Sequence, residues 1–204
     1  MPVSLLFRRD LFAGTMFLWV TFFASLLIIY LPSSRLPTLV KSTGVSLKTA
    51  SIVTSMFQVD GAVGAISHGW LMDQFKPNTV LAISYTLATV FIAAIGALAH
   101  SPVLVGLAVF GAGYCISGSQ VGANAFAASF YPTDCRATGV SWANGVGRIG
   151  SVLGSMSGGL MLLMNLSLPT VFVIVGLPAL IGGASMLLMG RRCARQERLA
   201  PATA

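Results

Sequence analysis

Five polar residues recur at regular intervals in an otherwise apolar part of the sequence. They are Ser141, Asn144, Arg148, Ser151 and Ser155, which are separated by 3, 4, 3 and 4 positions. This spacing places them on one stripe of a helix. Arg148 is the only charged residue in the range 137–189. A guanidinium in so apolar a run requires water, an anion or an acid beside it, because a lone intramembrane charge is costly.

Glycines occupy a different face of the same segment. Gly150, Gly154 and Gly158 form a GxxxGxxxG run. Two residues correspond to about 200° of helix rotation, so this run lies nearly opposite Arg148. Small residues allow a second helix to approach closely. The segment therefore has one face suited to packing and another suited to polar contacts.

Two further apolar segments carry polar side chains at helical spacing. One has, within a broad face, Tyr114, Ser117, Gln120 and Asn124; the other has Thr54, Gln58, Asp60 and His68. Asp60 either carries a proton or forms an ion pair with Arg148 that joins two helices; burial raises a carboxyl pKa and a nearby arginine lowers it, so the sequence leaves both open. His68 is expected to be a packed or interfacial histidine rather than a proton relay.

The composition is that of a membrane protein. Hydrophobic residues make up 55% of the 204 residues and charged residues 8%, whereas a soluble domain carries about 25% charged residues. The 12 basic residues exceed the 5 acidic ones, but they stand mostly at the edges of apolar runs, so we expect no nucleic-acid partner. The three cysteines form no CxxC pair, and we expect free thiols.

Enzyme chemistry has little support in this sequence. It contains no Walker-type phosphate loop, no cluster of metal ligands, and no Ser/His/Asp set with supporting polar residues. We therefore expect neither an enzyme nor a bound cofactor or metal.

Six segments are long and apolar enough for membrane-spanning helices, which need about 20 residues each. They are 11–31, 49–72, 79–99, 103–130, 137–164 and 170–189. Proline and polar residues separate them. Residues 1–10 form an N-terminal segment, 11–190 a six-helix transmembrane domain, and 191–204 a basic tail that we expect to be disordered. The predicted fold class is therefore all-α and integral to the membrane.

Basic residues favour one side of this arrangement. An even number of crossings puts both termini on the same side. The side that contains both termini also contains the second and fourth loops. It holds eight Lys and Arg residues: Arg8, Arg9, Lys76, Arg136, Arg191, Arg192, Arg195 and Arg198. The other loops and helix ends hold three: Arg35, Lys41 and Lys48. The positive-inside rule therefore predicts cytoplasmic termini.

Two stretches resemble a known family. "GWLMDQFKP", residues 69–77, resembles the loop after the second helix of each half of major facilitator transporters, although Gln74 replaces a basic residue and the second glycine is absent. The run from Gly111 to Leu160 is similar to the last third of the aromatic acid:proton symporters, which carry hydroxybenzoate-type acids. The resemblance extends over the chain as helices seven to twelve of twelve.

The resemblance implies a function and roles for individual residues. It implies two three-helix inverted repeats, alternating access, and proton-coupled uptake of an aromatic carboxylate across a bacterial inner membrane. The cytoplasmic gate loops would contain Gly69, Asp73, Lys76 and Arg136. Asp60 departs from the family pattern. The candidate substrate-binding residues are Arg148, Asn144, Ser151, Tyr114, Gln120 and Asn124.

The six helices that would precede these in the family are absent from the sequence. A half of this kind would function by pairing with a matching N-terminal half. The alternatives are a non-transporting fragment or helper subunit, and a six-helix homodimeric transporter of another organic anion. An intramembrane enzyme is the weakest alternative.

The topology can be tested by cysteine labelling in sealed cells. A membrane-impermeant thiol reagent should modify Ser33→Cys, which we place outside, and should leave Cys193 unmodified until the cells are permeabilised. Labelling of Cys193 in intact cells would place the C-terminus outside.

Overall fold

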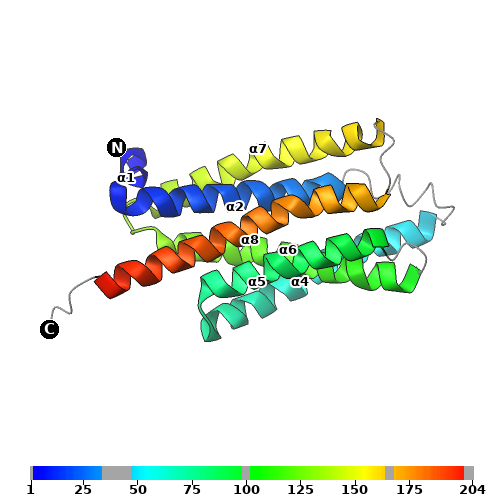
Figure 1. The fold of residues 1–204 in the computed structure, drawn as a ribbon, viewed down its shortest axis with the longest axis horizontal. Coiled ribbons are helices and arrows are strands. Elements are labelled where there is room, and N and C mark those ends of the chain that lie inside the picture. The colour runs from blue at the N-terminus through cyan, green and yellow to red at the C-terminus, as the bar shows by residue number, and fades with distance from the viewer. Residues whose placement is uncertain (1, 34–46, 98–101, 164–167, 200–204) are drawn as a thin grey trace.

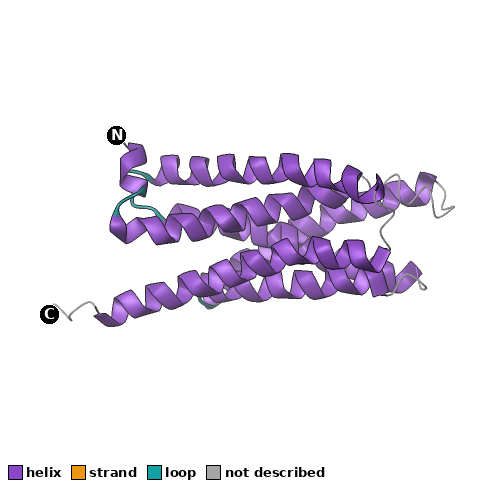
Figure 2. Ribbon diagram, turned by 45° about the horizontal axis from the view of Figure 1, so that its top comes forward, coloured by secondary structure: helices purple, strands orange, loops and turns teal. Residues whose placement is uncertain are grey.

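The computed structural model describes residues 2–33, 47–97, 102–163 and 168–199, and every regular element in these ranges is an α-helix. A short helix α1 comes first, and long helices follow it. Their bounds are α1 Pro2–Leu6, α2 Arg9–Ser33, α4 Leu47–Gln74, α5 Pro77–Ala97, α6 Pro102–Phe130, α7 Arg136–Leu163 and α8 Leu168–Leu199. The helices run roughly along one direction as a bundle (Figure 1). The start of α1 and the end of α8 lie at the same end of it (Figures 1 and 2).

Each predicted membrane segment falls on one long helix, but α8 extends further than expected. The basic segment after residue 190 continues α8 as far as Leu199. It is therefore helical up to this point rather than irregular. The sequence has no proline between Pro178 and Pro201 to end the helix. Contacts also hold this part of α8, because the guanidinium of Arg192 lies 5.6 Å from the centre of the Phe17 ring of α2.

Three helices of the described chain are long and apolar enough to cross a membrane. The apolar stretches are Leu11–Leu31 in α2, Pro77–Ile95 in α5 and Val173–Cys193 in α8. That α4, α6 and α7 also cross it stays a prediction.

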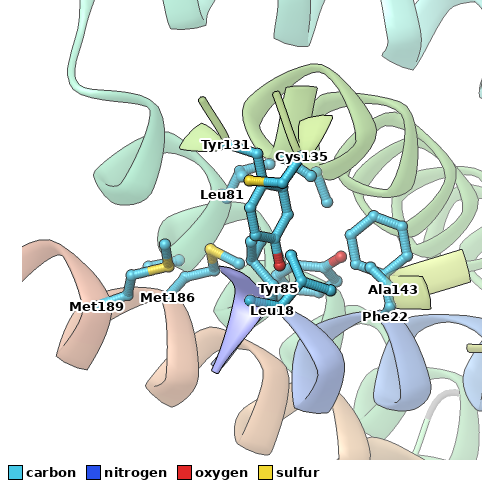
Figure 3. Close-up of a cluster of buried hydrophobic side chains, with 13 residues drawn as sticks. Leu18, Phe22, Leu81, Tyr85, Tyr131, Cys135, Ala143, Met186 and Met189 are labelled. Carbon is cyan, nitrogen blue, oxygen red and sulfur yellow. The ribbon is translucent and has the colours of Figure 1, made fainter. Parts of the chain in front are cut away.

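The packing of the helices follows a regular scheme. Helix α2 packs along α7 and α8, α6 packs along α4 and α5, and α5 packs along α8. Helices α2 and α6 also touch. These main contacts are unchanged if α2 is exchanged with α6, α4 with α7 and α5 with α8, whereas the smaller α6–α7 and α4–α5 contacts have no counterpart of similar extent among the described residues. The buried side chains form two clusters, one of which includes Leu18, Phe22, Tyr85, Tyr131 and Met186 (Figure 3).

Glycines allow α7 to lie directly against the backbone of α2. A methyl group added at Gly147 would lie 2.7 Å from Cδ1 of Leu26. One added at Gly150 would meet the carbonyl oxygen of Phe23, and one added at Gly154 that of Leu27. The predicted packing face is thus confirmed for Gly150 and Gly154. The contacts of Gly158 lie outside the described residues.

Adding one methyl group tests this contact. We expect Gly150→Ala to destabilise the bundle by about 1–3 kcal/mol, because overpacking forces the backbone of α2 to shift. Gly145→Ala is the matched control on the same helix, since nothing lies within 4 Å of a methyl group there. It should be neutral or stabilise by up to about 1 kcal/mol, because alanine favours helix over glycine. Unfolding in mixed micelles measures both, and equal stabilities would contradict the close approach.

Candidate functional site

An amide hydrogen bond joins α6 and α7 within the predicted polar stripes. Nδ2 of Asn144 donates to Oδ1 of Asn124 at 2.9 Å, and also lies 3.0 Å from the carbonyl oxygen of Val140. Nδ2 of Asn124 in turn donates to the carbonyl oxygen of Gln120 at 2.9 Å. Both asparagines are partly buried. The structure therefore brings together Asn124 and Asn144, which the sequence placed on separate stripes.

Arg148 lies one turn beyond Asn144 on α7 and is exposed. Four residues correspond to about 6 Å along a helix. Because α7 packs against α2 through glycines, its arginine points away from that contact. Ser151 and Ser155 follow on the same stripe, and their hydroxyls donate to carbonyl oxygens of their own helix at 2.7 and 2.8 Å. The Ser151 hydroxyl, which is the nearer of the two to Arg148, keeps a lone pair free for a ligand, while the Arg148 guanidinium remains accessible from this side of the bundle.

Gln120 lies on α6, one turn before Asn124. Its side chain is partly buried, and its Oε1 atom has no hydrogen-bond partner among the described residues. An acceptor in this state costs free energy unless a donor reaches it. Gln120 is thus placed near the asparagine pair, but its carbonyl end is turned inward.

Tyr114 takes part in a different contact. Its hydroxyl lies 2.5 Å from Oγ of Ser67 on α4. The Ser67 hydroxyl lies 2.8 Å from the Val63 carbonyl oxygen, so it donates there and accepts from Tyr114. Ten residues separate Tyr114 from Asn124, which is about 15 Å along α6. The four polar residues predicted on α6 therefore do not form one cluster.

His68 is buried between α4, α5 and α6, with 1% of its surface exposed. Nδ1 lies 2.8 Å from the Gly64 carbonyl oxygen, and Nε2 lies 2.8 Å from Oγ of Ser84. A carbonyl oxygen only accepts, so Nδ1 carries the proton and Nε2 accepts from the serine. Both ring nitrogens of the neutral imidazole are thereby satisfied. The prediction of a packed histidine is confirmed.

The α4–α6 contact around His68 is as close as the α7–α2 contact. A methyl group added at Gly64 would lie 2.6 Å from the Tyr114 carbonyl oxygen. One added at Gly118 would lie 2.5 Å from Nδ1 of His68. The partners Ser67 and Ser84 were not identified from the sequence. Their roles depend on which helices are neighbours, and the spacing along one helix does not carry that information.

Asp60 belongs to the helical range of α4, but its side chain lies outside the described residues. The ion pair with Arg148 and the proton-carrying role both stay hypotheses.

The predicted gate residues lie at the end of the bundle where the chain starts. Gly69, Asp73 and Lys76 are exposed at the end of α4 and in the turn to α5. Arg136 is exposed at the start of α7, and its Nε donates to the carbonyl oxygen of Tyr131 at 3.4 Å. The structure therefore places the two predicted gate loops at the same end.

Tyr131, which was not predicted as a site residue, anchors the second of these loops. Its ring is 1% exposed, and its hydroxyl donates to Oγ of Thr15 at 3.3 Å. Burial raises the pKa of the Tyr131 phenol, while the hydrogen bond with Thr15 opposes this effect. The phenol thus stays protonated at neutral pH and remains a donor.

No group of three or more potential metal ligands occurs among the described residues. Cys115, Cys135 and Cys193 are not joined in disulfides among the described residues, in agreement with the prediction of reduced thiols.

An all-helical bundle with long apolar helices, glycine contacts between them and polar groups on selected faces defines a multi-pass membrane protein. The family model of the Major Facilitator Superfamily matches residues 18–204, and the chain belongs to this family. The resemblance inferred from the loop and helix motifs is confirmed.

Several named transport proteins are similar in sequence to this chain. The chain is 46% identical to a gallate transporter of Pseudomonas putida over 93% of its length and 42% of the relative. It is 40% identical to the 4-hydroxybenzoate transporter PcaK of Pseudomonas aeruginosa over 92% of its length and 42% of the relative. A benzoate transport protein of Acinetobacter baylyi is 28% identical over 98% of the chain and 43% of the relative. The chain thus spans less than half the length of these relatives.

Removing the Ser84 hydroxyl tests the assignment of His68. We expect Ser84→Ala to destabilise the bundle by about 1–2 kcal/mol, because Nε2 of the buried imidazole loses its donor. Ser185→Ala is the control, since that buried serine donates only within its own helix, to the Ile181 carbonyl oxygen at 2.8 Å. It should cost less than about 0.5 kcal/mol. Equal losses in micelle unfolding experiments would mean that the His68–Ser84 bond contributes nothing.

Proposed function

We propose that this chain forms the C-terminal six-helix half of a proton-coupled transporter for aromatic carboxylates of the benzoate and hydroxybenzoate type. A matching N-terminal half would complete it, and the protein would work by alternating access in the bacterial inner membrane. The family membership and the named relatives support this proposal. Differential binding of substrate and proton to two conformations would drive the cycle without covalent chemistry.

The packing supports an arrangement as two inverted repeats of three helices, α2–α4–α5 and α6–α7–α8. The equivalence extends to single contacts. Gly150 of α7 abuts the Phe23 carbonyl oxygen of α2, as Gly64 of α4 abuts that of Tyr114 in α6. Three residues earlier, Gly147 faces Leu26, as Gly61 faces Ser117. These matched pairs occur at the contacts that the exchange of repeats would interconvert.

One observation carries the substrate proposal: Arg148 is exposed on the side of α7 that faces away from its glycine contact, one turn from the Asn124–Asn144 pair. A guanidinium binds a carboxylate through two parallel hydrogen bonds. Its plane also stacks on aromatic rings, which an ammonium does less well. In a cavity between two halves, Arg148 could therefore pair with the carboxylate of an aromatic acid and stack on its ring.

The asparagine pair, Ser151 and Gln120 would complete the polar side of that cavity. The serine hydroxyl retains acceptor capacity, and the inward carbonyl end of Gln120 has no donor within the described part of the chain. Tyr114 would act at a distance, through its bond with Ser67 at the α4–α6 contact. Asp60 would either carry the proton or balance the charge of Arg148.

The gate residues would act at the cytoplasmic end. Arg136 is connected through the Tyr131 backbone to a side chain that reaches α2. A movement of α2 would thereby be transmitted to the loop that bears Arg136. Asp73 and Lys76 would form the other gate loop.

Substitution of Arg148 tests the substrate site. With a matching N-terminal half co-expressed, Arg148→Lys should keep expression and lose most binding of 4-hydroxybenzoate, since losing a buried charged contact costs about 2–5 kcal/mol. Ser155→Ala, on the same stripe, should bind within about twofold of the parent, because Ser155 lies seven residues from Arg148, about 10 Å along α7. Unchanged affinity in Arg148→Lys and Arg148→Gln would remove the arginine from the binding site.

Two further arms of this experiment separate the alternatives. If Asp60 is only the structural partner of Arg148, Asp60→Asn combined with Arg148→Gln should restore the folding that either change alone disrupts. The chain expressed without its partner half should give no uptake above background. Saturable uptake by the chain alone would favour a homodimer, and no uptake with the partner half would favour a helper subunit or fragment.

A further inference from the structure

A groove runs between α5 and α8 on the side of the bundle that these two apolar helices expose. It has a volume of about 210 Å³ and is lined by Ala82, Ile83, Thr86 and Leu87 of α5 and by Leu187 of α8. The larger of these side chains are well exposed: Ile83 by 54%, Leu87 by 45% and Leu187 by 43%. Both helices contain stretches long and apolar enough to cross a membrane. In a bilayer, the groove therefore faces hydrocarbon.

Two cations stand at one mouth of this groove. Arg191 follows Leu187 by four residues, which places it on the same face of α8 about 6 Å further along. Lys76 precedes Ile83 by seven residues, which corresponds to about two turns of α5. Both side chains are exposed. Among the described residues, neither forms an ion pair with a carboxylate.

A close contact between α8 and α5 lies next to both cations in the sequence. A methyl group added at Gly190 would lie 3.0 Å from Cβ of Asn78. The residue before Arg191 thus packs against the first turn of α5, directly after Lys76. The Lys76 carbonyl oxygen accepts from the backbone N–H groups of Thr79 and Val80 at 2.9 and 3.2 Å, so it caps this turn. The positive end of the α5 dipole lies at the same place and adds to the attraction for an anion.

We propose that this groove binds an anionic phospholipid, with an acyl chain along Ile83, Leu87 and Leu187 and the phosphate between Lys76 and Arg191. An apolar channel that ends at two exposed cations matches a molecule with an apolar tail and an anionic head. A second copy of the chain fits less well. In a symmetric dimer across this face, the same cations of both copies would lie at the same end and repel each other.

Arg192 provides a matched control for Arg191. It is the next residue and carries the same charge, but its guanidinium lies over the Phe17 ring of α2, away from the groove. Arg8, in the turn between α1 and α2, is exposed and serves as the control for Lys76. The variants Lys76→Gln/Arg191→Gln and Arg8→Gln/Arg192→Gln lose equal charge, and only the first pair changes the mouth of the groove.

Native mass spectrometry of the purified 204-residue chain in mild detergent tests the proposal. The chain should retain one phosphatidylglycerol in preference to a phosphatidylcholine with the same acyl chains. Each cation near an anionic lipid contributes about 1 kcal/mol, or about fivefold in affinity. Phosphatidylglycerol affinity should therefore fall about 25-fold in Lys76→Gln/Arg191→Gln and stay within about twofold in the control pair. Circular dichroism checks that both variants keep their helices.

A second variant tests the apolar part. Leu187→Trp should fill the groove and lower the retention of phosphatidylglycerol at least tenfold with the cations intact. Three results would overturn the proposal. Equal losses in the two charge pairs would leave only bulk attraction, equal retention of phosphatidylcholine would remove the role of the cations, and a lipid-free dimer that Leu187→Trp dissociates would make the groove an interface between two copies. Because none of these measurements involves transport, they stand independently of the proposed function.

Discussion

The approach of glycine to helix backbone is the contact on which the arrangement of this bundle depends. At Gly150 and Gly154, α7 has no side chain to separate it from the carbonyl oxygens of α2. In a membrane, helices gain little from the hydrophobic effect on association, so close packing of this kind supplies much of their attraction. It also fixes the rotation of α7 about its axis. With the glycines turned toward α2, Arg148 has to face the other way.

The polar side chains of the bundle fall into two groups as a result. Some of those at helix contacts satisfy one another, as His68 does with Ser84, and Tyr114 with Ser67, whereas Oε1 of Gln120 has no partner among the described residues. In hydrocarbon, an unsatisfied polar group is expensive, which accounts for the completeness of these pairs. Arg148 and the serines near it are instead directed outward from the bundle. A charge kept on such a face is accessible to a ligand, which supports the binding role proposed for Arg148.

The exposed surface also has two distinct regions. The face of α5 and α8 is apolar along the groove and becomes cationic at Lys76 and Arg191. The polar side of α6 and α7 belongs to a different part of the bundle, where the asparagine pair lies. The α5–α8 surface is thus suited to contact with lipid, and the polar side of α6 and α7 is suited to hydrogen bonding.

The sequence by itself determined that the six long apolar segments are helices, which family the chain belongs to, and that the glycines and Arg148 lie on opposite sides of α7. Each of these follows from local composition or from the period of 3.6 residues, which a single helix expresses without neighbours. The tertiary structure decided the remaining features, because they depend on which helices are adjacent. Only packing brings Asn124 to Asn144, gives the Tyr114 hydroxyl to Ser67 rather than to the polar stripe of α6, and joins His68 to Ser84. It also brings Lys76 and Arg191 to the same end of the α5–α8 contact, since residues so far apart in the chain meet only through the packing of these two helices.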